Sequence, residues 1–214
     1  AASLYDDAID SMLLIQRLGT AYQSTLPPYS EAVLRFEMSL FWDWLCGTTL
    51  QLNLSEGDEK SWHACCDILV ENALRQPQVF VHRDFHSRNL MFTKMDNPGI
   101  LDFQDALEGP FTYDLVSLLK DCYIRWPVAD VWQWALRYYH ELDAATREQV
   151  DEPQFRRYFE LMGIQRHLKA AGIFCRLKQR DGKSNYIADV PRTLNYIVEL
   201  GPEYEEMEFL VRLI

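Results

Sequence analysis

Apolar residues recur at helical spacing over most of the chain. The first predicted helix covers residues 4–18, with an apolar face made of Leu4, Ala8, Met12, Ile15 and Leu18. Ser30 has the side chain of a helix N-cap, and the second predicted helix follows it and ends near Gly47. A third predicted helix covers residues 58–75, and Pro77 limits its extent. These segments predict a helical layer in the first third of the chain.

The pattern changes in the middle of the chain to short runs rich in Val, Phe, Ile and Leu. Such runs, bounded by polar loops, predict three short strands at residues 78–84, 89–93 and 99–103. The helical period returns after Pro110 and predicts further helices over residues 113–124, 128–142, 153–178, 191–200 and 203–213. No internal repeat or linker interrupts residues 1–214, so we expect a single domain. The predicted class is α+β, mostly α with a small β insert.

Charge narrows the classes of partner. Acidic residues outnumber basic ones 32 to 21, which gives a formal net charge of -11. An acidic surface repels nucleic-acid polymers and anionic membranes, so we expect neither as a partner and favour a neutral or cationic ligand. No apolar run approaches the roughly 20 residues of a membrane-spanning helix, and the first ten residues contain aspartates where a signal peptide needs positive charge. We therefore expect a cytoplasmic protein.

Cysteine usage points to packing rather than chemistry. The five cysteines are odd in number and form no CxxC pair, so we expect reduced core residues. The segment 63–66 contains one histidine and two cysteines, but the helical period places both cysteines on an apolar face. Trp132 and Trp134 lie two residues apart on a predicted helix, so at most one of them lines a cleft.

Reactive side chains are densest between the first two predicted strands. The run 82–89 supplies the carboxylate of Asp84 and the amide of Asn89, and Asp102 follows at the end of the third predicted strand. Because strands hold their position while the loop between them turns, Asp84 and Asn89 can face one point, and the hairpin returns Asp102 to it. We therefore expect three oxygen ligands or acceptors to converge.

Three convergent oxygens suit phosphoryl transfer. Asp84 is placed to orient an attacking hydroxyl and accept its proton, while Asn89 and Asp102 are placed to hold Mg²⁺ on nucleotide phosphates. A zinc site at His82 and His86 is the alternative. It is the weaker one, because HxxxH is common by chance and no third soft ligand lies nearby.

The same residues resemble a known family. Its pattern is His-x-Asp-[Leu/Phe]-His-x-x-Asn-[Leu/Ile], then a hairpin ending in Asp-Phe or Asp-Trp, then an Asp-Leu-[Ala/Val] helix start. It is met by His82, Asp84, Phe85, His86, Asn89, Leu90, Asp102, Phe103, Asp114, Leu115 and Val116. The chain thus resembles the aminoglycoside phosphotransferase and choline kinase branch of the protein-kinase-like superfamily. Within that branch, segments spread over nearly all 214 residues look most like the kinases that phosphorylate the anomeric hydroxyl of N-acetylmuramate and N-acetylglucosamine in peptidoglycan recycling.

The resemblance implies a kinase-like carboxy-terminal lobe, with ATP and Mg²⁺ as cofactors and a small-molecule sugar as acceptor. Asp84 is then the base that faces the sugar hydroxyl, with Asn89 and Asp102 as metal ligands. His82 supports the catalytic loop, and Asp114 is a buried acceptor for that loop's backbone amides. The implied substrate-binding residues are Glu37, His86, Arg88 and Asp105. For Arg88, contact with phosphate and an ion pair with the acidic surface both stay open.

One part of the family pattern is missing. None of the nine glycines forms a GxGxxG, and all six lysines lie at position 60 or later. Neither the phosphate-covering loop nor the nucleotide-anchoring lysine of the amino-terminal lobe is therefore present. We expect residues 1–214 to be the carboxy-terminal lobe without that nucleotide lobe, and to be inactive by themselves.

Two other functions stay open. An aminoglycoside antibiotic phosphotransferase would suit an acidic cleft, because aminoglycosides are polycations. A non-catalytic kinase-like binding protein would keep the lobe and lose the chemistry, although the presence of Asp84, Asn89 and Asp102 argues against it. The sequence does not predict an oligomeric state.

Overall fold

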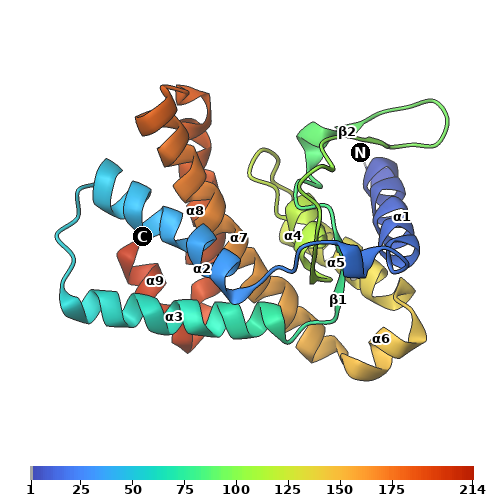
Figure 1. Cartoon of the computed structure of the whole chain (residues 1–214), viewed down its shortest axis with the longest axis horizontal. Helices are drawn as coiled ribbons and strands as arrows, with labels where there is room; N and C mark the ends of the chain where they lie inside the picture. Colours follow the sequence, from blue (N-terminus) through green and yellow to red (C-terminus); the bar gives the residue numbers. More distant parts are fainter. Residues whose placement is uncertain (1) are drawn as a thin grey trace. The chain divides into compact units, whose positions relative to one another are not determined.

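The computed structural model describes residues 2–214 and confirms a mostly helical protein with a small β component (Figure 1). Its α-helices are α1 (Ala2–Gly19), α2 (Glu31–Leu40), α3 (Glu56–Leu74), α4 (Tyr113–Leu119), α5 (Val128–Glu141), α6 (Ala144–Gln149), α7 (Glu152–Asp181), α8 (Val190–Leu200) and α9 (Glu208–Leu213). Its strands are β1 (Gln78–Val81), β2 (Leu90–Met91), β3 (Gly99–Ile100) and β4 (Leu107–Pro110). Several 3₁₀ turns and one π-helical segment, Phe41–Thr49, lie between them.

The chain divides into two compact units. The first contains the residues up to Tyr29 together with Ala73–Phe159, and the second contains Ser30–Asn72 together with Glu160–Ile214. All four strands and the segment 82–89 belong to the first unit. The expectation that residues 1–214 act as one lobe stays a prediction.

The strands form two antiparallel pairs. In one pair Gln78 of β1 lies opposite Pro110 of β4, and in the other Leu90 of β2 lies opposite Ile100 of β3. Three of these strands lie within the predicted runs, whereas β4 was not predicted because Gly109 and Pro110 usually interrupt regular structure. Pro110 is tolerated because it is the last residue of its strand, where a missing N–H donor costs little.

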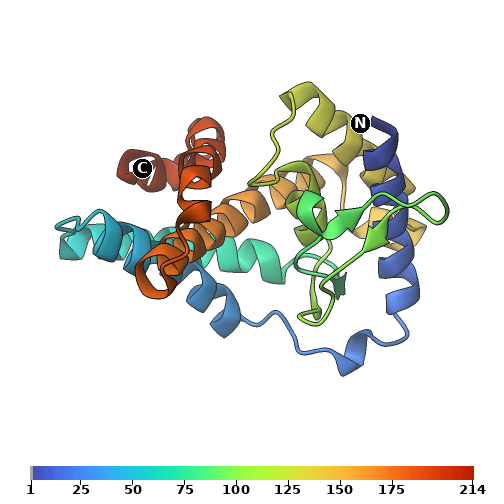
Figure 2. The same cartoon turned by 90° about the horizontal axis from the view of Figure 1, so that it is seen from above.

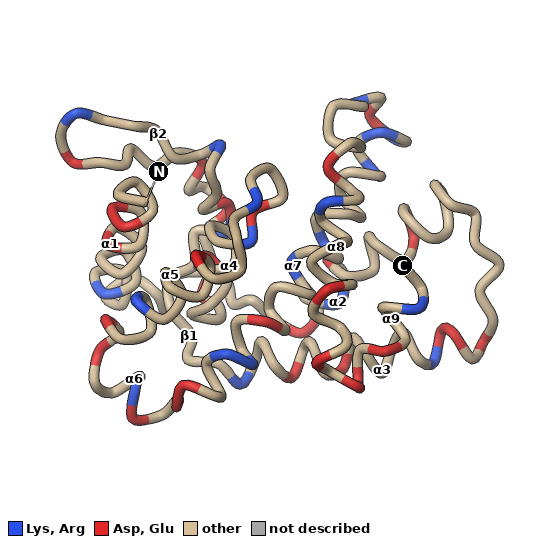
Figure 3. The backbone as a smooth tube through the Cα atoms, turned by 180° about the vertical axis from the view of Figure 1, so that it is seen from behind, with Lys and Arg blue, Asp and Glu red and all other residues tan. Residues whose placement is uncertain are grey.

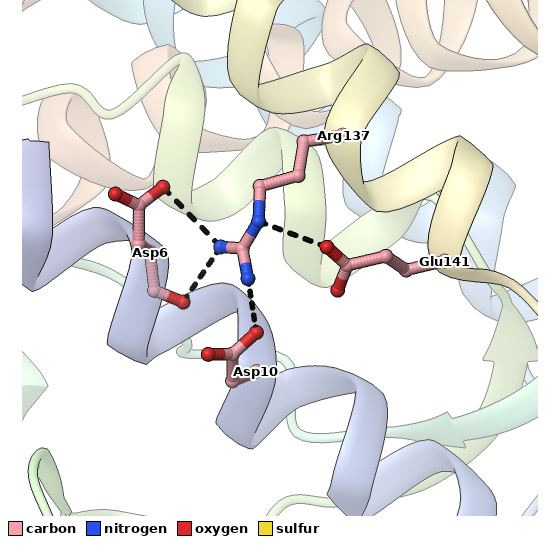
Figure 4. A network of polar contacts seen from close by, with 4 residues as sticks. All are labelled: Asp6, Asp10, Arg137 and Glu141. Carbon is pink, nitrogen blue, oxygen red and sulfur yellow. Dashed lines mark hydrogen bonds and ion pairs between the residues drawn. The ribbon is translucent and has the colours of Figure 1, made fainter.

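In the first unit α1 lies beside α5, as Figures 1 and 2 show from two directions. Arg137 of α5 joins the two helices, because its guanidinium donates to the Asp6 carbonyl oxygen at 3.0 Å and contacts Asp10, both on α1 (Figure 4). It also donates to a carboxylate oxygen of Glu141 on its own helix at 3.0 Å. Partial burial opposes the charge, but these carboxylates hold the pKa of Arg137 above its usual value. Exposed pairs of this kind contribute about 0.2–1 kcal/mol each.

A buried polar contact closes the same unit. The Tyr138 hydroxyl lies 2.7 Å from the Gln16 amide oxygen and 2.9 Å from the Phe111 carbonyl oxygen, and Gln16 donates to that carbonyl at 3.2 Å. Burial raises the pKa of Tyr138, so the hydroxyl stays neutral and serves as a donor. Residues from α1, α5 and the segment after β4 are thereby held together.

In the second unit, α2 packs against the part of α7 that begins at Glu160. Ser30 accepts a hydrogen bond from the Val33 amide at 3.4 Å, which confirms the predicted N-cap. On the buried face of α2, the Glu37 carboxylate pairs with the Lys169 ammonium at 2.9 Å and accepts from the Gln165 amide at 3.3 Å. A buried carboxylate is tolerated when it is paired and hydrogen-bonded in this way.

Several helix boundaries differ from the prediction. The second predicted helix is α-helical only to Leu40 and continues as the π-helical segment Phe41–Thr49, and the last predicted helix is α-helical only over Glu208–Leu213. The helix predicted to reach residue 124 ends at Leu119, because Lys120 leaves the helical backbone region. The short helix α6 was not predicted, and Asp143 caps it by accepting from the Thr146 amide at 2.9 Å. The six residues of α6 are polar or small, so no apolar pattern predicts a helix there. The cap at Asp143 stabilises the start of this helix.

The described residues also test the predictions about cysteine, tryptophan and membrane segments. All five cysteines are free and buried, as expected, and burial raises the pKa of Cys46 and of Cys66 to about 12. Trp134 stacks on Tyr5, whereas Trp132 packs against Phe159. Among residues 2–214, no helix has the length and apolarity needed to cross a membrane.

Gly172 of α7 lies directly against the backbone of another segment of the second unit. A Cβ atom at this position would lie 2.3 Å from the carbonyl carbon of Leu40 and 2.4 Å from the amide nitrogen of Phe41. Because backbone atoms cannot move aside as a side chain can, we expect Gly172→Ala to destabilise the protein by about 1–3 kcal/mol. Chemical denaturation measured by circular dichroism checks this value.

Gly57 of α3 provides the matched control. Its added Cβ would meet the Ser55 hydroxyl oxygen at 3.5 Å, an ordinary contact distance. Gly57→Ala should therefore be neutral or stabilising, by up to about 1 kcal/mol, because alanine favours helix. Equal unfolding free energies for the two variants would contradict the close approach at Gly172.

Candidate active site

The candidate site is built on the loop between β1 and β2. β1 ends at Val81, which is fully buried, and Phe85 is fully buried in the middle of the loop. The 3₁₀ turn Ser87–Asn89 returns the chain to β2. Between and beside these two buried apolar residues the polar side chains of the loop are half-buried, except for His82, which is buried, and Arg88, which is exposed.

Asp114, in the first turn of α4, holds the beginning of this loop. Its carboxylate is 2% exposed and accepts from the His82 amide at 2.7 Å and from the Arg83 amide at 3.0 Å. The family resemblance implies backbone amides of this loop as the partners of Asp114. The contact fixes a backbone that is otherwise unfavourable, because Arg83 has a positive φ of 76°.

Asp121, just beyond α4, holds the end of the loop. Its carboxylate is 1% exposed and accepts from the Ser87 amide at 3.0 Å and from the Tyr123 amide at 2.9 Å. Asp121 was not predicted from the sequence as a site residue. The available signal was an acidic residue seven positions after Asp114, close to the end of an apolar helix.

Asp84 and Asn89 are joined through the loop backbone. The Asn89 amide nitrogen donates to the Asp84 carbonyl oxygen at 3.1 Å, and the His86 amide donates to the same oxygen at 3.0 Å. This bond uses the nitrogen of the Asn89 amide and so sets the direction of its oxygen. The half-buried Asp84 carboxylate is carried by a closed turn rather than by an open loop.

Asp102 reaches the loop through the hairpin of β2 and β3. The Leu101 amide donates to the Asn89 carbonyl oxygen at 3.0 Å, which connects the two segments one residue before Asp102. β3 ends at Ile100, so Asp102 is exposed and lies beyond the strand rather than at its last position. Its positive φ of 61° is a second strained backbone position beside the site.

The buried ring of His82 is influenced by the charges of two carboxylates, those of Asp84 and Asp102. Burial lowers the pKa of His82, while the nearby charges of Asp84 and Asp102 and the backbone of Leu101 act in the opposite direction. Both carboxylates therefore lie close enough to influence one buried ring. The ring packs edge-on against Phe85, with centroids 5.8 Å apart, as a support of the loop would.

His86 and Arg88 both contact the ring of Tyr123. The Arg88 guanidinium carbon lies 3.5 Å from the centre of that ring, and the His86 ring approaches it edge-on with centroids 5.5 Å apart. The hydroxyphenyl group is thus a platform for two of the predicted substrate-binding residues. Tyr123 was not among the residues selected from the sequence.

Two predicted substrate-binding residues remain, Asp105 and Glu37. Asp105 is exposed in the turn after β3, close to Asp102 in the chain. Glu37 belongs to the second unit, where its carboxylate pairs with Lys169. Substrate roles for Asp105 and Glu37 stay predictions.

Within residues 2–214, no three His, Cys, Asp or Glu side chains gather into a group that could hold a metal ion. The oxygen pair of Asn89 and Asp102 is the candidate that remains, and Mg²⁺ is commonly held by one or two protein oxygens together with waters and phosphates. His82 and His86 acquire no third ligand of these types, so the zinc alternative gains no support.

The acidic excess is spread along the molecule. Acidic residues occur on α1 and at the start of α3, for example Asp6, Asp7 and Asp10 on the former and Glu56, Asp58 and Glu59 on the latter (Figure 3). The net charge therefore does not by itself mark a binding site for a polycation.

The helical fold with its two antiparallel strand pairs is that of a kinase-like phosphotransferase, and the sequence identifies the family more narrowly. It belongs to the phosphotransferase enzyme family, APH, whose sequence profile matches residues 2–158. Among solved structures it is similar to ethanolamine kinase from Plasmodium vivax, with a TM-score of 0.58 and 13% identity over 91% of this chain and 59% of that one. At this identity the likeness concerns the fold alone.

Curated relatives are more similar in sequence. Proteins named N-acetylmuramate/N-acetylglucosamine kinase from Pseudomonas putida, Pseudomonas aeruginosa and Neisseria meningitidis are 43%, 44% and 42% identical to it over 100%, 97% and 97% of the chain. The chain spans 62% of the length of each of these relatives.

The hydrogen bonds from the loop amides to Asp114 can be tested by substitution. Asp114→Ala leaves the His82 and Arg83 amides buried without an acceptor, so we expect a loss of about 1–3 kcal/mol of stability. Asp114→Asn keeps one acceptor oxygen and should lose less. Thermal unfolding of both variants beside Asp96→Asn, a change at an exposed turn residue whose positive φ of 51° asparagine tolerates, checks the prediction, and equal melting temperatures in all three would contradict a buried acceptor role.

Proposed function

We propose that the protein to which this chain belongs is an ATP-dependent kinase of an amino sugar, acting on the anomeric hydroxyl of N-acetylmuramate and N-acetylglucosamine. The observation that carries the proposal is the closed turn that sets Asp84 and Asn89 together and joins them to the hairpin of Asp102. Family membership supports the reaction type, and the names of the bacterial relatives support the acceptor. Neither alternative function gains a specific observation.

The reaction requires a hydroxyl, a phosphoryl donor and a proton acceptor. The sugar oxygen forms a bond to the γ-phosphorus of ATP, the bond from that phosphorus to the bridging oxygen breaks, and ADP leaves with the electron pair. Asp84 orients the hydroxyl and takes its proton, and no covalent enzyme intermediate is formed. Because the transition state is loose, alignment contributes more than basicity.

Mg²⁺ fits the donor set of this site. The amide oxygen of Asn89 and the carboxylate of Asp102 are hard oxygen ligands, and the hydrogen bond from Asn89 to Asp84 leaves that amide oxygen available. When bound with the nucleotide, Mg²⁺ neutralises charge on the phosphates. The chain's own contribution is to hold these two oxygens beside Asp84.

The fold contributes to this chemistry mainly by keeping the loop rigid. Asp114 and Asp121 bind backbone amides at the two ends of the loop, so Asp84 needs little reorganisation before reaction. Positioning of this kind contributes several kcal/mol to rate enhancement in enzymes, about 7–11 kcal/mol in favourable cases. The strained backbone at Arg83 and Asp102 is consistent with a loop held for function.

Asp84→Asn tests the proposed base. The change is nearly isosteric, so the fold should be kept, while kcat for N-acetylmuramate should fall about 100-fold or more because the amide cannot take the proton. The assay is coupled ADP release by the complete protein. Asp96→Asn, an exposed carboxylate in the hairpin turn, is the control and should keep full turnover. A fully active Asp84→Asn variant would remove Asp84 from the role.

Asn89→Ala and Asp102→Ala test the metal ligands. Each removes one oxygen donor, so the Mg²⁺ concentration for half-maximal rate should rise about tenfold or more. Asp96→Ala removes a charge from the same hairpin without removing a proposed ligand, and should leave that concentration unchanged. The same rise in all three variants would show that general charge, rather than coordination, sets the metal dependence.

A further inference from the structure

Arg88 is held by an aromatic platform that the proposed reaction does not by itself explain. Its guanidinium carbon lies 3.5 Å from the centre of the Tyr123 ring, well within the range of a cation–π contact. The same ring contacts His86 edge-on. A long, flexible cation on the surface is thereby given a defined place.

One carboxylate fixes both sides of this contact. Asp121 accepts from the Ser87 amide at 3.0 Å and from the Tyr123 amide at 2.9 Å, so it positions the turn that carries Arg88 and the residue that carries the ring. Asp121 is itself almost fully buried. The distance between Arg88 and Tyr123 is therefore set by the fold rather than by chance contact of two surface side chains.

The direction of Arg88 separates it from the proposed metal ligand beside it. Both residues lie in the 3₁₀ turn Ser87–Asn89, where neighbouring side chains diverge by about 120°. The Asn89 amide faces the Asp84 carbonyl, and the Arg88 guanidinium faces the Tyr123 ring instead. Arg88 and the proposed metal ligand Asn89 therefore leave the turn in different directions.

We propose that Arg88, positioned by Tyr123 and Asp121, binds the carboxylate of an acidic amino sugar and so sets the preference between acidic and neutral acceptors. This inference rests on the proposed function. N-acetylmuramate carries a carboxylate on its lactyl ether, whereas N-acetylglucosamine carries none. A guanidinium offers planar, paired donors that match a carboxylate, and its charge is permanent. Tyr123 is a positioning residue in this scheme, because it acts through Arg88.

The test compares two sugars in the complete protein. Arg88→Gln should lower the ratio of kcat/KM for N-acetylmuramate to that for N-acetylglucosamine about tenfold, chiefly through KM, because a charge-assisted contact is lost for one sugar only. Calorimetric titration with N-acetylmuramate in the absence of nucleotide should show weaker binding by a similar factor. Arg147→Gln, which removes the same charge from the exposed side of α6, should leave the ratio unchanged.

Tyr123 variants separate positioning from simple folding. Tyr123→Phe keeps the ring face under the guanidinium and should keep the ratio, whereas Tyr123→Leu should lower it about threefold. Equal melting temperatures in the two variants would show that the difference is not one of stability. A ratio that falls equally in both would overturn the platform role of the ring.

The remaining outcomes distinguish this inference from the proposed function. If Arg88→Gln lowers kcat/KM for both sugars by the same factor, Arg88 acts on phosphate or on the fold, and the inference is overturned while the kinase assignment stands. If the unmodified protein phosphorylates neither sugar, the proposed function fails first, and the inference fails with it.

Discussion

The carboxylate of Asp114 is the constraint on which the catalytic loop depends. It is 2% exposed, and a buried carboxylate without partners costs several kcal/mol. Only donors directed at both of its oxygens make that burial tolerable, and the His82 and Arg83 amides supply them at 2.7 and 3.0 Å. The loop must therefore adopt one backbone path, including the positive φ of Arg83, which costs about 1–3 kcal/mol by itself. The position of Asp84, the next residue, follows from that path.

A chain of backbone contacts extends this constraint across the site. Asp121 binds the Ser87 amide at the far end of the loop, so the two ends of one short helix, α4, are tied to the two ends of one short loop. Asn89 continues the series, because its side chain donates to the Asp84 carbonyl and its own carbonyl accepts from Leu101. The hairpin that carries Asp102 is thereby connected, through the loop, to the same helix, α4. Loss of one member should loosen the others, since such networks are not additive.

Elements that depend on a local sequence pattern were predicted, whereas elements and contacts that depend on residues distant in the chain were not. Apolar spacing predicted most helices, and the hydroxyl of Ser30 predicted where α2 begins. β4 was missed because its residues become a strand only by pairing with β1, almost thirty positions earlier. Asp121 was missed for the same reason: beside Lys120 it reads as a solvated residue in the last turn of the helix predicted over residues 113–124, and only the folded loop turns the Ser87 amide toward it. The burial of Glu37 depends likewise on Lys169 of α7.

The protonation state of His82 determines whether this ring contributes positive charge to the loop. Two neighbouring carboxylates favour the imidazolium, yet burial opposes it more strongly, and the pKa of His82 falls below its usual value. At neutral pH the ring is therefore uncharged, and it supports the loop by packing on Phe85 rather than by attracting phosphate. A reaction between an anionic nucleotide and a chain of net charge -11 nevertheless needs local positive charge. In the proposed mechanism Mg²⁺ supplies it on the nucleotide, and Arg88, held on Tyr123, supplies it on the side of the acceptor sugar.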